Sequence, residues 1–403
     1  MKILFVSTSI PPATDMQTTR NMYLIQALQK ENNDVDILTC GSVDEENISP
    51  EFKSVLSKSK VFRTDYPHFY KHHIEVNECS RNAFTKKMHN VFINYLAIPD
   101  LYRGWEKKGL KLIEKNNLFD YDILITASGS YTAHIIGNEW CDRTKKKWIA
   151  EYGDPWGIDA YGRIRKINYS IEQKILKKCS AITFTTQATI DAYERYVRKN
   201  IKYKLIPCGF NRIIKDGEIQ KKDMSYFFLY TGIAYKRDRN LIPAIQAFGD
   251  NGEATFNLIG TLSEQFKLEA QKYNNVNVLG RVNYDESLEE ISKTDVLVHI
   301  GNFGLLQVPG KTYIYLASQK PILYIRQEKG KDPTWDILKR FNGIISCYNN
   351  KCAIQKAIEY IIKNYSDLKR ESINRSVSKE LYAYSWERIG NQFVEFVNDI
   401  FKL

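Results

Sequence analysis

Short runs rich in Val, Ile and Leu recur along this chain, and helix-like segments separate them. Strands that are apolar on both faces are typical of a sheet covered by helices on both sides, and regular alternation with helices favours parallel strands. The pattern therefore predicts an α/β protein with doubly wound parallel sheets. In the first half we expect strands at 2–7, 35–39, 122–126, 147–153, 181–186 and 204–207.

A polar, turn-rich stretch at 208–225 interrupts this alternation, which then restarts. With 403 residues the chain is too long for one ordinary core and long enough for two domains. We expect a Rossmann-like domain at 1–208, a second at 209–384, and a cleft between them. An amphipathic helix at 385–403 is expected to pack back on the first domain. The strands expected in the second half are 227–232, 256–260, 276–280, 295–300, 322–325 and 343–347.

The composition predicts a cytoplasmic protein with reduced thiols. The chain has no run near the roughly 20 apolar residues that a membrane span needs. Its beginning is typical of a buried strand rather than of a secretory signal. The seven cysteines include no CxxC pair, so we expect neither a disulfide framework nor a zinc site.

The net charge of +11 is compatible with nucleic acid, an anionic membrane surface or phosphate-bearing substrates as partners. We find no nucleic-acid-binding motif and expect no such partner. The segment 83–117 mixes lysines with aromatic and aliphatic residues. It is either a basic amphipathic helix in peripheral contact with the cytoplasmic face of the membrane, or a solvated helix whose apolar stripe is core.

A cluster of basic residues follows the first strand of the second half. That strand ends at Gly232, where the absence of a side chain permits the close approach of a ligand. The next loop carries Lys236, Arg237 and Arg239. Because guanidinium groups bind phosphate oxygens with paired hydrogen bonds, this loop is a candidate phosphate site.

A second basic site is predicted where Gly310 and Lys311 follow Pro309. Proline favours a helix start here, and the free amides and dipole of a helix N-terminus attract anions. Each basic cluster alone would be an ordinary solvated surface. Since ligands of parallel sheets bind at the carboxyl ends of the strands, the two clusters together predict one diphosphate pocket.

The loop after the first strand of the chain, STSIPPATDMQTTR, contains no GxGxxG. A dinucleotide cofactor held in that manner is therefore not expected. The helix after this loop is expected to begin near Thr18. The loop is either a plain connection or a segment that closes over the acceptor or the donor.

Eight short runs stand in a specific order and spacing along nearly the whole chain. They are 98–105 (IPDLYRGW), 121–137 (YDILITASGSYTAHIIG), 147–157 (KWIAEYGDPWG), 172–186 (EQKILKKCSAITFTT), 204–210 (KLIPCGF), 230–238 (YTGIAYKRD), 275–286 (NVNVLGRVNYDE) and 307–323 (QVPGKTYIYLASQKPIL). Together they resemble the retaining GT-B glycosyltransferases of family four, in particular bacterial enzymes of surface polysaccharide synthesis. The resemblance implies transfer of a sugar from a nucleotide-sugar donor to a saccharide or polyprenyl-linked acceptor, in capsule or lipopolysaccharide assembly.

The resemblance also implies which residues of the second domain hold the donor. Arg237 or Arg239, together with Lys311, would bind the diphosphate, and Arg237 and Lys311 would act on the leaving group. Fixed cations can stabilise that group without a metal, and no DxD loop is present, so we expect no metal and no cofactor. The base is expected at Gly280, Arg281 and Val282, the sugar at Asn302, Phe303 and Gly304, and further donor contacts at Gly232, Lys236, Gly310, Thr312, Tyr313 and Ile314.

In the first domain, the resemblance places Asp154 and Trp156 at a strand end that faces the reacting centre. Asp154 would orient the acceptor or act as a weak base, and Trp156, His134 and Thr18 would contact the acceptor. Ordinary structural roles remain as alternatives, with Asp154 as a helix cap, Trp156 as packing and His134 as a buried histidine.

One position departs from the family pattern. The family commonly carries a glutamate three residues after the lysine, where it accepts hydrogen bonds from ribose or sugar hydroxyls. This chain has Ile314 there, and residues 311 and 314 of a helix share a face. Two further interpretations therefore stay open: a catalytically silent protein that binds a nucleotide or a partner enzyme, and a sugar-nucleotide epimerase on the same fold. The lack of paired carboxylates in the expected cleft counts against the epimerase.

Overall fold

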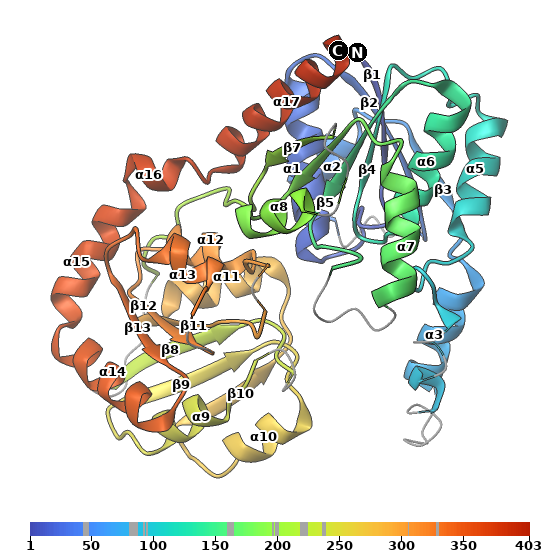
Figure 1. Cartoon of the computed structure of the whole chain (residues 1–403). Coiled ribbons are helices and arrows are strands. Elements are labelled where there is room, and N and C mark those ends of the chain that lie inside the picture. The colour runs from blue at the N-terminus through green and yellow to red at the C-terminus, as the bar shows by residue number, and fades with distance from the viewer. Residues whose placement is uncertain are drawn as a thin grey trace. The chain divides into compact units, whose positions relative to one another are not determined.

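The computed structural model describes the chain as two compact units (Figure 1), which are Met1–Pro207 with Trp386–Leu403, and Cys208–Ser385. The predicted boundaries lay after residues 208 and 384. Each unit has its own sheet and its own hydrophobic core. The residues described are 1–42, 48–79, 88–91, 93, 96–158, 165–195, 197, 201–217, 225–235, 239–304, 306–327 and 330–403.

The first unit contains a seven-stranded sheet in the order β3-β2-β1-β4-β5-β6-β7, in which every pair is parallel. The chain order reverses between β1 and β4, so this is the topological switch point of the sheet. The strands are β1 Lys2–Val6, β2 Asp34–Cys40, β3 Val61–Thr64, β4 Ile123–Ala127, β5 Lys147–Tyr152, β6 Ala181–Phe184 and β7 Lys202–Leu205. The edge strand β3 was not among the predicted strands, because it is short and only half-buried.

Helices cover the first sheet on both faces, with α1 and α2 opposite α5 and α6 (Figure 1). The last helix, α17, packs along α1: the indole of Trp386 stacks on Tyr23 with ring centroids 5.2 Å apart. Gly390 makes this contact close, since a Cβ there would lie 2.6 Å from that of Ala27. The helices of this unit are α1 Met16–Lys30, α2 Pro50–Leu56, α3 His68–Cys79, α5 Trp105–Lys115, α6 Thr132–Thr144, α7 Arg165–Leu176, α8 Gln187–Glu194 and α17 Trp386–Lys402.

The second unit contains a six-stranded parallel sheet in the order β10-β9-β8-β11-β12-β13, with its switch point between β8 and β11. The two sheets confirm the predicted fold class, α/β with two doubly wound Rossmann-like sheets. The strands are β8 Tyr226–Thr231, β9 Ala254–Ile259, β10 Val276–Gly280, β11 Val296–Ile300, β12 Ile322–Arg326 and β13 Ile344–Tyr348. The helices are α9 Ile242–Gly249, α10 Glu264–Ala270, α11 Tyr284–Lys293, α12 Lys311–Leu316, α13 Pro333–Leu338, α14 Lys351–Lys363, α15 Tyr365–Ser376 and α16 Lys379–Tyr382.

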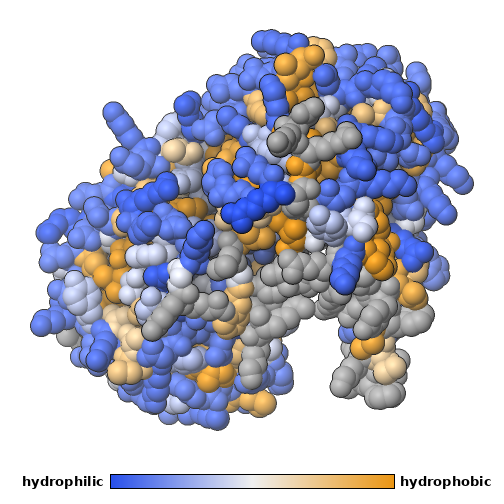
Figure 2. All heavy atoms as spheres, in the orientation of Figure 1, coloured by the Kyte–Doolittle hydropathy of each residue, from blue (hydrophilic) through white to orange (hydrophobic). Residues whose placement is uncertain are grey.

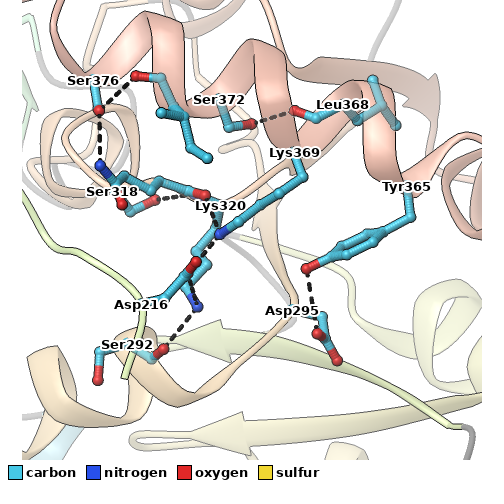
Figure 3. A network of polar contacts seen from close by, with 12 residues as sticks. Asp216, Ser292, Asp295, Ser318, Lys320, Tyr365, Leu368, Lys369, Ser372 and Ser376 are labelled. Carbon is cyan, nitrogen blue, oxygen red and sulfur yellow. Dashed lines mark hydrogen bonds and ion pairs between the residues drawn. The ribbon is translucent and has the colours of Figure 1, made fainter. Parts of the chain in front are cut away.

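The polar connection that enters the second unit is anchored by an ion pair between a buried lysine and a partly exposed aspartate (Figure 3). Lys320 has a side chain only 1% exposed, and its Nζ lies 2.7 Å from Asp216 Oδ1 and donates to Ser292 O at 2.7 Å. Burial lowers the pKa of Lys320. For Asp216, burial raises the pKa, but hydrogen bonds from Lys320 and Lys369 outweigh it and hold that pKa below its ordinary value.

We predict that Asp216→Asn lowers the free energy of unfolding by about 2 kcal/mol, less than for a fully buried pair because Asp216 is 45% exposed. The pKa of Asp216 is depressed, so this contribution should be present at neutral pH and lost as the pH falls through the lowered pKa. Denaturant unfolding of the full chain measures it. The control is Asp250→Asn, which removes the exposed Asp250–Lys351 pair and should lower the free energy of unfolding much less. Equal costs would contradict the prediction.

Candidate functional site

Three neighbouring strands of the second sheet end in glycines with left-handed backbones: Gly232 (φ 126°), Gly260 (φ 127°) and Gly280 (φ 79°). The turns touch, because Gly260 N donates to Gly280 O at 2.7 Å, and a Cβ on Gly260 would lie 2.1 Å from Gly232 O. A side chain on Gly260 is therefore excluded. A Cβ on Gly280 would meet open space. This edge of the sheet is bare backbone that a ligand can approach closely.

Lys311 of α12 reaches this edge from the neighbouring strand connection. Its Nζ donates to Thr231 O at 2.8 Å and lies 3.8 Å from the centroid of the Tyr230 ring. The ring face attracts the ammonium group, which keeps the long side chain in one place. Lys311 is thereby positioned beside Gly232, where the nearest atom to an added Cβ would be its Nζ, at 3.8 Å.

Arg239 is held beside Lys311 by neutral acceptors. Its Nε donates to Asn302 Oδ1 at 2.6 Å, and its Nη1 donates to Ile233 O at 2.7 Å and to the Tyr230 hydroxyl at 3.3 Å. These bonds join the loop after β8 to the loop after β11, the two strands of the switch point. The guanidinium group is therefore pre-positioned rather than mobile.

The two cations have no counter-ion within the described part of the chain: no carboxylate there lies within salt-bridge distance of Lys311 or Arg239. Burial, and then the charge of Arg239, lower the pKa of Lys311 well below its ordinary value. A partly buried pair of like charges is costly unless an anion joins it. The arrangement is thus complementary to a ligand with at least two negative charges, such as a diphosphate.

His299 supports this site and was not predicted, because a histidine inside an apolar strand gives no signal in the sequence. It is fully buried, and its Nε2 lies 2.8 Å from the hydroxyl oxygen of Thr312. Burial, followed by the charges of Lys311 and Arg239, lowers the pKa of His299 well below its ordinary value, so the ring is neutral. Together with the Tyr315 hydroxyl, which accepts from Thr231 N at 2.9 Å, this contact attaches α12 to the sheet.

The expected anion site at the start of α12 needs correction. The helix has only six residues, and two of its first amides are already bonded, Thr312 N to Pro309 O at 2.9 Å and Tyr313 N to Gly310 O at 3.2 Å. Anion attraction at this edge therefore comes from the side chains of Lys311 and Arg239. The predicted donor contacts of Thr312 and Tyr313 are also replaced by internal ones, since both side chains are buried and the Tyr313 ring lies 5.1 Å from that of Tyr384.

The other predicted donor residues are distributed as follows. Ile314 is buried, 8% exposed, one helical turn from Lys311. Lys236 and Arg237 lie outside the described residues. In the loops after β10 and β11, Arg281 is exposed, and Val282, Phe303, Gly304 and Gly310 are half-buried.

In the first unit, two predicted acceptor contacts are structural. His134 is fully buried, its ring stacks on Tyr152 at 4.5 Å, and burial lowers its pKa to about 3. The prediction that His134 touches the acceptor is therefore wrong. Thr18 is 1% exposed, and both its amide and its hydroxyl donate to Asp15, the N-cap of α1. Helix α1 accordingly begins at Met16 rather than near Thr18.

Trp156 is also an internal residue, whereas Asp154 is exposed at the end of β5. The indole of Trp156 is 2% exposed and stacks on Tyr131, with ring centroids 5.0 Å apart. Its amide donates to the Tyr193 hydroxyl at 2.9 Å, and that hydroxyl donates to the buried Glu172 at 2.7 Å. The packing interpretation holds for Trp156, and these bonds fix the turn that presents Asp154.

No family model and no curated protein matches the chain, but solved structures do. A sucrose-phosphate synthase from Thermosynechococcus elongatus has a TM-score of 0.69 at 16% identity, covering 100% of this chain and 99% of that chain. Anabaena HepE in complex with UDP-glucose has a TM-score of 0.67 at 13% identity, with 99% and 100% covered. WaaG, a glycosyltransferase involved in lipopolysaccharide biosynthesis, has a TM-score of 0.59 at 10% identity, with 98% and 99% covered.

Each of these likenesses extends over both units and over nearly the whole of the other protein. The chain has the GT-B fold. A fold hosts many activities, so the chemistry of this GT-B chain has to be argued from the residues at its strand ends.

We predict that Lys311→Met raises the free energy of unfolding of the ligand-free protein by about 1 kcal/mol, because it removes a desolvated cation that no described carboxylate pairs with. This advantage should shrink as the pH rises through the lowered pKa of Lys311, since the native lysine then releases its proton while the unfolded one keeps it. Denaturant unfolding across a pH series measures both effects.

The matched control is Lys320→Met in the same unit, which should destabilise the protein because it removes the partner of Asp216. If Lys311→Met instead destabilised the protein as much as Lys320→Met does, the charge of Lys311 would be balanced by an anionic partner, and the prediction would be wrong.

Proposed function

We propose that this chain is a glycosyltransferase that transfers a sugar from a nucleotide-sugar donor to a saccharide acceptor. The observation that carries the proposal is a pair of cations, Lys311 and Arg239, at the switch point of the second sheet, for which the described residues supply no counter-ion. Ligands of open parallel sheets bind at such points. Anabaena HepE, a protein of the same fold, was solved in complex with UDP-glucose, which supports a nucleotide-sugar donor.

The same residues suit the chemistry of the transfer. When the glycosidic bond of the donor breaks, negative charge builds on the nucleoside diphosphate, and pre-positioned cations stabilise it without reorganisation. Lys311 and Arg239 are both fixed by hydrogen bonds before any ligand arrives. We propose that they serve in place of a metal ion, that Asp154 orients the acceptor hydroxyl, and that the anomeric configuration is retained.

A second candidate is supported by one residue. Ile314 lies on α12 one turn from Lys311 and cannot accept hydrogen bonds from hydroxyl groups of the donor. A protein that binds a nucleotide without transferring a sugar would need the cations and not the hydroxyl contacts. Tight nucleotide binding without turnover on a broad acceptor panel would favour this candidate.

We further propose that the protein acts in the cytoplasm in the synthesis of surface polysaccharide. It would contact the membrane peripherally, where a lipid-linked acceptor is held. No described helix has the length and apolar character to cross a bilayer, and hydrophilic side chains predominate on the face drawn in Figure 2. Within 83–117, helix α5 buries Trp105 and Ile113 completely, so its apolar stripe is core. For α5 this favours the alternative of a solvated helix with a core-facing stripe. Residues 83–87, 92, 94 and 95 of that segment lie outside the described residues.

We predict that nucleoside diphosphates and nucleotide sugars raise the melting temperature of the protein, since ligand at about 100 times Kd adds roughly 2.7 kcal/mol. Lys311→Ala and Arg239→Ala should each weaken this binding by about 10- to 100-fold, the contribution of a charge-assisted hydrogen bond. A thermal-shift titration measures it. Lys267→Ala, at an exposed lysine of α10, is the control and should bind as the wild type does. Unchanged stabilisation of Lys311→Ala would refute the site.

We also predict that removal of divalent cations leaves donor binding intact. The two fixed cations already neutralise a diphosphate, so a metal bridge is not required. The same titration, repeated in excess EDTA, should give a Kd within about twofold of the untreated value, well below the tenfold that 1.4 kcal/mol would produce. Loss of binding in EDTA that Mg²⁺ restores would contradict metal independence.

A further inference from the structure

Strands β8 and β11 diverge at the switch point of the second sheet, and Thr231 lies beside the gap. Strand β8 pairs with β9 as far as Thr231, whereas its described pairing with β11 ends at Leu229. The N–H and the C=O of Thr231 therefore receive no ladder partner from β11. Unpaired peptide groups inside a protein are costly, so nearly all of them find another partner.

Helix α12 supplies both of the missing partners. The Tyr315 hydroxyl accepts from Thr231 N at 2.9 Å and lies 3.0 Å from Thr231 Oγ1. Lys311 Nζ donates to Thr231 O at 2.8 Å. The two side chains are four residues apart on α12 and so share one face of the helix. Tyr315 and Lys311 therefore take the place that β11 would have in a continuous sheet.

The ring of Tyr315 is held in one position by its neighbours. Its side chain is fully buried, and the His299 ring stands nearly perpendicular to it, with ring centroids 5.7 Å apart. Nε2 of His299 lies 2.8 Å from the hydroxyl oxygen of Thr312, on the same helix as Tyr315. Closely packed interior side chains have little freedom to shift. The end of β8 is thus attached at Thr231 to a fixed point.

This attachment determines how the Lys311 ammonium group is directed. An ammonium group has three N–H donors. One of them is bonded to Thr231 O, and the centroid of the Tyr230 ring lies 3.8 Å from the nitrogen. The direction of the other donors depends on where the Thr231 carbonyl lies. The Tyr315 hydroxyl fixes that carbonyl by holding the amide of the same residue.

We propose that Tyr315 is a positioning residue for the donor diphosphate: its hydroxyl holds Thr231, and Thr231 directs the Lys311 ammonium group toward the ligand. This inference rests on the proposed function and adds a residue that lies beneath the surface a ligand would contact, since Tyr315 is fully buried. A remote hydroxyl can have this effect because small errors in the position of a binding group are costly.

The test is a double-mutant cycle of nucleotide binding on the full chain. UDP, GDP and ADP are titrated into the wild type by thermal shift, and the tightest of them is used with each variant. Tyr315→Phe keeps the ring and removes the hydroxyl, and it should raise the Kd by about fivefold, the usual contribution of one neutral hydrogen bond. In the Lys311→Met background the same substitution should change the Kd by less than about twofold, because its effect passes through Lys311.

The matched control is Tyr365→Phe, at the opposite end of the same two strands. The Tyr365 hydroxyl donates to Asp295 (Figure 3), and Asp295 accepts from Phe227 N of β8 at 2.9 Å. Tyr315→Phe and Tyr365→Phe should both lower the melting temperature of the ligand-free protein, but Tyr365→Phe should leave the Kd unchanged. The cooperative melting transition of each variant shows in the same titration that it is folded.

An unchanged Kd in Tyr315→Phe, equal effects of Tyr315→Phe and Tyr365→Phe on the Kd, or the same loss with and without Lys311 would overturn the inference. In each of these cases the wild type still binds the nucleotide, so the proposed function stands. If none of the three nucleotides stabilises the wild type, the proposed function is refuted and the inference with it.

Discussion

In a wholly parallel sheet every strand ends at the same edge, and the rest of this structure depends on that constraint. Both sheets are parallel throughout, so segments far apart in the sequence meet beyond the ends of neighbouring strands. Arg239 follows β8 and Asn302 follows β11, yet they are hydrogen-bonded because these strands adjoin. In the first unit, Gly153 and Ser128 are brought together in the same way.

The two edges differ in how their charged groups are paired. At the second sheet, Lys311 and Arg239 are held by neutral groups and remain uncompensated within the described residues. At the first sheet, Asp15 and Asp100 already occupy the helix N-termini, and Arg20 is paired with Glu151.

Periodicity predicted most strands and the class of the fold, since near-continuous apolar runs separated by helical segments have few other solutions. A basic loop after a glycine-ended strand led to Arg239, and a lysine at an expected helix start after Pro309 led to Lys311. For His134 the structural alternative holds over the acceptor contact taken from the resemblance, since its ring is stacked on Tyr152 in the core. The sequence analysis also missed His299, because the role of a buried histidine depends on neighbours such as Thr312, which only the tertiary structure places beside it.

The sequence by itself determined that two parallel sheets form and that cations follow the strands of the second, because both depend on local pattern. The tertiary structure decided which polar groups are already satisfied. Asp100 caps α6 from a distant segment, the amides of Thr312 and Tyr313 bond within their own turn, and the amide of Thr231 bonds to the Tyr315 hydroxyl. Such pairing depends on distances of a few ångströms between segments that the sequence does not place, and it is this pairing that determines where a ligand can bind.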